Sequence, residues 1–409
     1  MNPTNQYSKT VFTTAVIVAA LGYFVDIYDL LLFSIVRKAS LESIGYSGAD
    51  LEKYGLMLIN IQMAGMLIGG ILWGMWADKR GRLSVLFGSI VLYSLANILN
   101  GFASDITFYA ILRFVAGIGL AGELGAGITL VAESLPKEKR GYGTMIVATI
   151  GVSGAVFAGI ISRYFDWRTC YFIGGALGIA LLILRISVYE SGLFQKITEQ
   201  EVKRGNFFQL FSNRKTFLKY LNCIVIGMPT WFTIGILVTF SPEFSKMLNV
   251  NGVIKGGDAI MFTYCGITVG DFACGFLSQV LKSRKKAVLA FLLLTCLGLL
   301  LYFTAYNSSA AYFYFTMFVI GTGTGFWAVI VTNAAEQFGT NIRGTVATTV
   351  PNFIRGSLPI ITLGYTLLQL GFSKLVSAEI LAVIIMSISL WALHHTAETY
   401  GKDLDFVEE

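Results

Sequence analysis

Charged residues, histidine and proline are all scarce in this chain. Only 13% of its 409 residues are charged and six are proline, whereas 55% are hydrophobic and the mean hydropathy is +0.69. This composition excludes an ordinary soluble globular protein. The two histidines, His394 and His395, are adjacent, and the five cysteines show neither CxxC nor metal-ligand spacing. We therefore expect no metal, no cofactor and no enzyme.

In place of charge, the chain has a series of long apolar runs. About twelve of them are long enough to cross a hydrocarbon layer of roughly 30 Å, so we predict an all-α membrane protein. The polar N-terminus carries no signal-peptide pattern, so the first run is expected to be a retained span. The runs cover residues 11–36, 54–77, 84–103, 107–134, 142–162, 169–189, 217–241, 258–281, 286–306, 311–335, 344–370 and 375–396.

Basic residues gather in alternate loops between these runs. Lys and Arg in short loops stay on the cytoplasmic side, so we expect both termini in the cytoplasm and the protein in the cell (inner) membrane, with many spans. The net charge of +6 is then a topology signal rather than a nucleic-acid surface. The basic loops follow the second, fourth, sixth, eighth and tenth runs and hold Lys79, Arg80, Arg82, Lys137, Lys139, Arg140, residues 196–219, residues 282–286 and Arg343.

The longest connection between runs divides the chain into two halves. It is polar and basic, and we predict a first bundle over 1–190, a cytoplasmic linker over 191–216 and a second bundle over 217–409, ending in a short cytoplasmic tail. A weak repeat supports the division, because the segment from Gly275 to Lys286 follows the eighth run as the segment from Gly74 to Arg82 follows the second. Parallel repeats of this kind indicate two six-helix bundles around a central cavity.

The loop after the second run carries a recognisable motif. Gly74 lets two helices approach closely, Asp78 can face a helix N-terminus or an Arg, and Gly81 makes the turn before Arg82. This spacing resembles the loop motif of the major facilitator superfamily, with Leu83 where a second basic residue is usual. The resemblance implies the major facilitator fold and alternating access, with two pseudo-symmetric six-helix bundles.

Two further acid and base positions lie near the same membrane surface. Glu133 and Arg140 close the fourth run and its loop, in a pattern similar to that of symporters of the superfamily. Together with Gly74, Asp78 and Arg82 they are expected to form a cytoplasmic gate.

Acidic residues inside the spans are candidates for proton coupling, because a charge in the bilayer needs a cavity or a partner. Asp26 and Asp29 are three residues apart on one face of the first run, in a pattern that resembles phosphate:proton and aromatic-acid:proton families. Two carboxylates so close do not both ionise easily, so one could carry a proton, or one could be satisfied structurally. Glu123 in the fourth run could accept a proton or cap a neighbouring helix.

The other intramembrane charges indicate an anion site. Arg113 and Arg355 are permanent positive charges, one in each half, that could together draw in an anionic group. Arg355 could instead be neutralised by Asp271, and Arg113 could belong to a structural salt bridge. We assign to substrate binding Arg113, Asp271, Arg355 and Asn352, with Tyr28 and Trp231 as aromatic lining.

These observations favour a secondary active transporter of a small, anionic metabolite, working as a proton symporter and a monomer in the lipid bilayer. Its partners would be the solute and protons, with no nucleic acid. An antiporter of drugs or cations remains as an alternative, although such antiporters have a Gly-Pro-rich fifth span and residues 142–162 contain no proline. An uncoupled facilitator, or a symporter of zwitterions or sugars, is also open. The sequence does not specify the solute, the direction of transport or which of Asp26 and Asp29 titrates.

Overall fold

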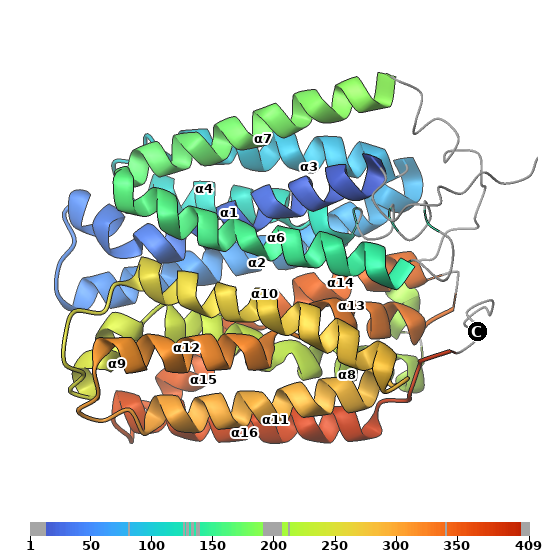
Figure 1. Ribbon diagram of the computed structural model, residues 1–409. Helices are drawn as coiled ribbons and strands as arrows, with labels where there is room; N and C mark the ends of the chain where they lie inside the picture. Colours follow the sequence, from blue (N-terminus) through green and yellow to red (C-terminus); the bar gives the residue numbers. More distant parts are fainter. Residues whose placement is uncertain are drawn as a thin grey trace, which may run out of the picture.

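The computed structural model contains a bundle of helices that run along one common axis (Figure 1). It describes residues 14–80, 82–125, 127, 131, 135, 140–190, 207–211, 213–339 and 342–401, and within these ranges the side chains of 15, 77–80, 82, 83, 140, 141, 187–190, 209 and 344 are not described. In Figure 1 the helices of the first half lie above those of the second. They are α1 (Thr14–Ser43), α2 (Ala49–Arg80), α3 (Arg82–Asn100), α4 (Ile106–Leu120), α6 (Arg140–Tyr164) and α7 (Trp167–Glu190) in the first half, and α8 (Arg214–Phe232), α9 (Ser241–Met247), α10 (Gly256–Val280), α11 (Arg284–Phe303), α12 (Ala310–Thr324), α13 (Trp327–Glu336), α14 (Arg343–Gly356), α15 (Leu358–Leu368) and α16 (Lys374–His395) in the second, with short turns at Phe207–Phe211 and Thr233–Val238.

The predicted spans are confirmed as helices. Among the residues that the structure describes, ten helical stretches are long and apolar enough to cross a membrane, and the shorter α3 and the pair α14–α15 occupy the other two predicted positions. An α-helix satisfies its backbone hydrogen bonds internally, which is the requirement that lipid imposes on a spanning segment. The chain is therefore an all-α, multi-pass membrane protein.

Three spans of the second half are irregular at their middle. The span that begins with α8 changes to a π-helix at Thr233–Val238, after Pro229. The tenth span breaks between α12 and α13, and the eleventh breaks at Ser357, just before Pro359. Proline and such local changes of helix type are common causes of kinks and freed backbone groups in helices. Hydropathy alone predicted each of these spans as one continuous run.

The two halves repeat the same close helix packing. A Cβ added to Gly65 on α2 would overlap the carbonyl oxygen of Phe114 on α4, and a Cβ added to Gly266 on α10 would overlap that of Phe318 on α12. One turn further on, the same relation joins Gly69 to Ile118 and Gly270 to Thr322. Small residues allow this approach between membrane helices, where van der Waals contact drives association. The weak sequence repeat thus has a counterpart in packing.

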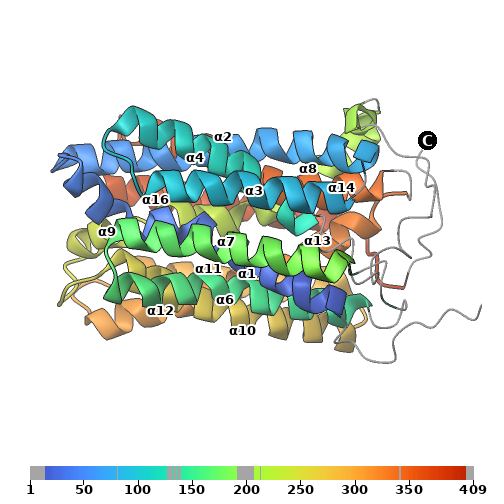
Figure 2. The same ribbon diagram turned by 90° about the horizontal axis from the view of Figure 1, so that it is seen from above.

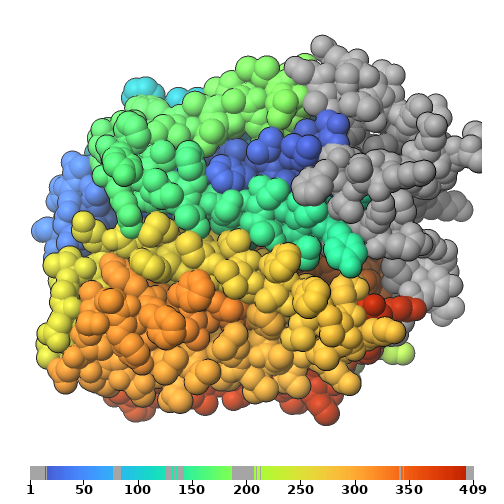
Figure 3. Space-filling model, viewed as in Figure 1, coloured from blue at the N-terminus to red at the C-terminus, as the bar shows by residue number. Residues whose placement is uncertain are grey.

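The halves meet along α6 with α10 and along α2 with α14. Figure 3 shows the first of these seams, and Figure 2 shows the bundle from a second direction. α1 is the most enclosed of the spans, with 83% of its most apolar stretch buried, because it packs against α6, α7 and α10 together. Residues on α1 are therefore placed between the halves.

The segment after α16 folds back onto the start of α11. The Glu398 carboxylate accepts a hydrogen bond from the Ser283 hydroxyl and others from the backbone N–H groups of Arg284 at 2.9 Å and Lys285 at 3.2 Å. Partial burial opposes ionisation, but the hydrogen bonds from Ser283 and from the backbone of Tyr400, Arg284 and Lys285 outweigh it and lower the pKa of Glu398 to about 2. This end segment is thus held at the N-terminus of α11, where a carboxylate also meets the helix dipole favourably.

Candidate functional site

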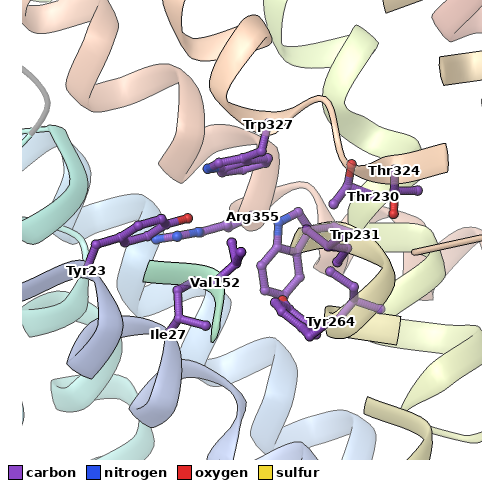
Figure 4. Close-up of a pocket in the computed structure, with 11 residues that line it drawn as sticks. Tyr23, Ile27, Val152, Thr230, Trp231, Tyr264, Thr324, Trp327 and Arg355 are labelled. Atoms are coloured by element: carbon purple, nitrogen blue, oxygen red, sulfur yellow. The ribbon is translucent and has the colours of Figure 1, made fainter. Parts of the chain in front are cut away.

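A cavity lies between the two halves at the level of the irregular spans. It has an empty volume of about 310 Å³, and both halves contribute to its wall (Figure 4). The wall is mostly aromatic and aliphatic, with the hydroxyl groups of Thr230 and Thr324, and among the described residues Arg355 is its one charged member. The lining residues are Tyr23, Ile27, Val152, Thr230, Trp231, Ile234, Tyr264, Ile267, Thr324, Trp327 and Arg355. An apolar cavity with few convergent polar groups is the usual form of a small-molecule site.

Arg355 faces the first half across this cavity. Its Nη2 lies 3.7 Å from Oδ2 of Asp26 on α1, and its guanidinium carbon lies 5.6 Å from the centre of the Trp327 ring. Both Arg355 and Asp26 are buried. Within the described residues, Nε and Nη1 of Arg355 donate no hydrogen bond, and neither oxygen of Asp26 accepts one. The two buried charges therefore lack most of the hydrogen bonds that buried ions usually make, and Arg355 has N–H groups that could donate to a ligand.

The interpretation that Asp271 neutralises Arg355 is wrong. Oδ1 of Asp271 instead accepts a hydrogen bond from the backbone N–H of Ala328 at 3.1 Å, so Asp271 caps the first turn of α13. The sequence could not show this, because a single continuous tenth span would have had no exposed helix N-terminus at that depth. Asp271 also does not line the cavity.

Arg113 and Asp29 lie in a separate polar cluster inside the first half. Arg113 donates to Asn97 at 3.0 Å and to Gln62 at 3.4 Å, and its guanidinium carbon lies 5.0 Å from the Tyr171 ring. Asp29 lies within electrostatic reach of the positive charge of Arg113 and beside the Asn97 side chain. The expectation that Arg113 and Arg355 meet across one cavity is therefore not realised here, since Arg113 is not part of the cavity wall.

Two other predicted contact residues also point away from the cavity. The hydroxyl of Tyr28 donates to the carbonyl oxygen of Cys170 on α7 at 2.8 Å, and it is Tyr23, one and a half turns earlier, that reaches the cavity. Asn352 donates to the carbonyl oxygens of Ala121 at 2.8 Å and Thr348 at 2.9 Å. Trp231 does line the cavity, as predicted.

Glu123 forms a buried ion pair with Arg185 on α7. Nη1 of Arg185 donates to Oε2 of Glu123 at 3.0 Å and to the carbonyl oxygen of Leu86 at 3.1 Å, and the Nη2–Oε1 contact completes the pair. Gly22 on α1 passes so close that a Cβ there would overlap both side chains. The geometry supports a structural role for Glu123, as a bridge between helices of the first half.

On one side of the cavity, α14 closes against the first half. Asn352 makes its bond to Ala121 here, and a Cβ added to Gly74 would lie 3.8 Å from the Thr349 methyl group. Gly74 thus faces α14 at ordinary van der Waals distance, and its role in a gate stays a prediction. The side chains of the other predicted gate residues, Asp78, Arg82, Glu133 and Arg140, lie outside those that the structure describes.

On the other side of the cavity, a second set of contacts joins the halves. Arg37 on α1 pairs with Glu243 on α9 at 2.7 Å, donates to the carbonyl oxygen of Thr239 at 3.4 Å and lies 4.2 Å from the Phe240 ring. Further contacts here are Arg163 with Asp258 at 2.6 Å, Asn60 with Thr362 at 2.8 Å, and Lys374 with Glu52. Sequence reasoning missed these residues, although acids in the loops of this face were a signal that they need basic partners. The cavity is therefore enclosed between two sets of contacts between the halves.

Within the described residues, no group of three or more His, Cys, Asp or Glu side chains is placed to hold a metal ion. The cavity itself offers a solute the Arg355 guanidinium and several aromatic rings.

Comparison with known proteins identifies the family. The family model described as Major Facilitator Superfamily matches residues 11–362. Among the relatives, the niacin transporter NiaP of Acinetobacter baylyi is 25% identical over 80% of this chain and 80% of its own length, and the gentisate transporter of Corynebacterium glutamicum is 22% identical over 92% and 88%. The structure of the proton:xylose symporter XylE, bound to 6-bromo-6-deoxy-D-glucose, is similar with a TM-score of 0.69 at 17% identity, over 96% of this chain and 97% of that one. Because the family model covers most of the chain, the chain belongs to the major facilitator superfamily and is a membrane transporter of small-molecule solutes, not an enzyme.

Proposed function

We propose that this protein is a proton symporter for a small carboxylate, which it moves by alternating access. The observation that carries the proposal is Arg355, a buried cation whose Nε and Nη1 donate no hydrogen bond to the described residues, in the wall of a cavity with no other charged residue in its described lining. A buried cation of this kind favours an anionic ligand, and the planar guanidinium matches a carboxylate in a two-bond geometry.

Competition for Arg355 would couple the proton to the anion. With the cavity empty, the Asp26 carboxylate is the charge partner of Arg355, at 3.7 Å. A proton that binds Asp26 removes its negative charge, which leaves the buried arginine without a partner unless an anion enters. A substrate carboxylate would then take the place of Asp26. One proton and one monovalent anion enter together, so the loaded site keeps the net charge of the empty one.

The rings around Arg355 favour a flat substrate. Tyr23, Trp231, Tyr264 and Trp327 all contribute to the wall, and offset or edge contacts between aromatic rings stabilise a bound ring beyond simple burial. Two relatives bear names that refer to niacin and gentisate, both ring-bearing acids. XylE, the relative in fold, is described as a proton symporter. These names support an aromatic carboxylate and proton coupling for this chain.

The two sets of contacts around the cavity would open in turn. In the proposed cycle the bundles over 1–190 and 217–409 move as bodies joined by 191–216. The contacts of Arg37 part on the outer side, and those of Asn352 and Gly74 part on the cytoplasmic side. The predicted gate residues Asp78, Arg82, Glu133 and Arg140 would act with the cytoplasmic set. We retain the orientation predicted from the basic loops, with both termini in the cytoplasm.

Transport by the purified protein in proteoliposomes tests this proposal. The probes are radiolabelled nicotinate and nicotinamide, which share a ring and differ in charge. We expect an inwardly directed proton gradient to drive nicotinate accumulation and a protonophore to abolish it, with nicotinamide transported poorly. Loss of a charge-assisted bond worth roughly 1.5–3 kcal/mol should weaken nicotinate binding about ten- to a hundred-fold in Arg355→Gln, with partial rescue in Arg355→Lys.

The coupling step has its own variants. Asp26→Asn mimics the protonated acid, so it should keep nicotinate exchange while losing accumulation against a gradient. Asp29→Asn serves as the matched change one helical turn away, and it tests whether the second cluster also binds the coupled proton. The double variant Asp26→Asn, Arg355→Gln removes both buried charges and controls for folding. Equal handling of nicotinate and nicotinamide by the wild type, at any proton gradient, would contradict the anion assignment.

A further inference from the structure

The break in the tenth span places an aromatic residue beside Arg355. α12 ends at Thr324 and α13 begins at Trp327, so the Trp327 indole projects into the cavity at the break (Figure 4). The break brings Gly325 against α10 so closely that a Cβ on Gly325 would lie 2.6 Å from the Cα of Gly270. The residue that follows Gly270 on α10 is Asp271.

The Asp271 side chain stabilises this break through hydrogen bonds to the start of α13. Its carboxylate accepts a hydrogen bond from the backbone N–H of Ala328 at 3.1 Å and interacts with the backbone N–H of Trp327 as well. Both belong to the first turn of α13, whose N–H groups have no partner within the helix. Because the acceptor lies on α10, the cap fixes the direction in which α13 starts, and therefore the position of the Trp327 ring.

The Trp327 indole has a donor that nothing in the described structure uses. Trp327 is only 5% exposed, and its Nε1–H has no hydrogen-bond partner among the described residues. A buried indole N–H normally finds a partner. With Arg355 next to it, the acceptor that would satisfy both is a carboxylate with one oxygen toward each.

We propose that Trp327 is a substrate-contact residue whose indole N–H binds the substrate carboxylate beside Arg355, and that Asp271 is its positioning residue. The identity of the bound group as a carboxylate rests on the proposed function, whereas the positioning of Trp327 by Asp271 does not. This pairing of Asp271 with Trp327 gives a role to Asp271, a buried acid that neither neutralises Arg355 nor lines the cavity.

The positioning step is tested without any substrate. The six tryptophans are replaced biosynthetically with 5-fluorotryptophan, and the fluorine resonance that is lost in Trp327→Phe is assigned to Trp327. We expect Asp271→Ala to move or broaden this resonance, while Asp271→Asn, which keeps an acceptor oxygen, leaves it in place. Thr263→Ala is the matched control, since Thr263 is buried on the same helix and its hydroxyl donates to the carbonyl oxygen of Ala259, one turn earlier in α10. An unchanged Trp327 resonance in Asp271→Ala would overturn the positioning role.

The contact step is tested by a double-mutant cycle with nicotinate as the probe. Trp327→Phe keeps a ring and removes the N–H, so nicotinate affinity should fall about ten-fold, as for one bond to a charged group. Asp271→Ala should cause a similar fall in the wild type but less than about two-fold in the Trp327→Phe background, because it acts through Trp327. Additive effects would refute the coupling and indicate a general loss of structure. If Trp327→Phe binds nicotinate as well as the wild type does, while Arg355→Gln does not, the contact role fails and the proposed function stands.

Discussion

Arg37 should control how often the cavity opens on the side of α9. Its side chain is 4% exposed, and it joins α1 to the second half through Glu243, the Thr239 carbonyl and the Phe240 ring. A hydrogen bond between charged groups contributes roughly 1.5–3 kcal/mol, and we take the lower end because Glu243 is 30% exposed. A cation–π contact adds about 0.5 kcal/mol. Arg37→Gln should therefore favour the open form by about 2 kcal/mol, or about 30-fold.

The assay is the rate at which a membrane-impermeant maleimide labels a single cysteine at Ile27, a residue of the cavity wall. The five native cysteines are first replaced by serine or alanine, and labelling is compared in intact cells and in inverted vesicles. Since labelling follows the open population, Arg37→Gln should raise the rate about ten- to thirty-fold in intact cells only, if α9 faces outward as predicted.

Arg163→Gln is the matched control for this measurement. Arg163 also carries an ion pair across the halves on the same side, with Asp258, but its side chain is 49% exposed. An exposed pair contributes roughly 0–1 kcal/mol, so its loss should change the rate by less than about five-fold. If Arg37→Gln and Arg163→Gln gave equal rates, the argument that buried contacts of Arg37 hold this side closed would be refuted. A faster rate only in inverted vesicles would reverse the predicted orientation.

Three further predictions follow from other contacts. Asn352→Ala removes a neutral hydrogen bond to Ala121 worth about 1 kcal/mol, so it should raise labelling of Ile27→Cys from the opposite membrane side about five-fold, and no change there would exclude Asn352 from closure. Gly65→Ala should lower thermal stability by about 1–3 kcal/mol through overlap with α4, measured by thermal unfolding in detergent, whereas an unaltered melting temperature would contradict the close packing. Glu398→Gln should destabilise the protein at neutral pH. Because the pKa of Glu398 is lowered to about 2, the contribution of its carboxylate to stability is complete above the ordinary glutamate pKa near 4.3 and is lost as the pH falls toward 2. The stability difference between this variant and the wild type should therefore shrink with acidification, and a difference that grew would contradict the assignment.

The sequence predicted the spans well and the contacts of individual side chains poorly. Hydropathy locates a span because lipid requires about 20 apolar residues in a row, whatever they pack against. The rotation of each helix about its axis depends on packing between helices, and in α1 this packing turns Tyr28 toward α7 and Tyr23 toward the cavity. Asp26 was correctly singled out as a buried acid in need of a partner. Its partner Arg355 lies in the other half, and no local pattern relates positions so far apart.

The broken helices account for the other failures. The tenth span reads as one apolar run, so its interior offers no helix terminus for Asp271 to cap, and pairing with Arg355 was the simplest expectation. Glu123 had two open interpretations, and Arg185, the residue that pairs with it, was hidden in the sixth run. In each case the missing information was which backbone or side-chain group lay opposite, which is a property of the assembled bundle.

The repeated glycine packing also shows where the two halves have diverged. Gly69 and Gly270 hold equivalent places in it, so the next residues, Gly70 and Asp271, are equivalent too. In the first half this position is a glycine that lies against Asn352 of the opposite bundle, and in the second it is an acid that supports a broken helix. The same position in the packing thus lies at the contact between the halves in one case and at the broken tenth span in the other. A substitution at Gly70 should therefore act on the contact between the halves, whereas one at Asp271 should act on the start of α13 and on the Trp327 ring in the cavity wall.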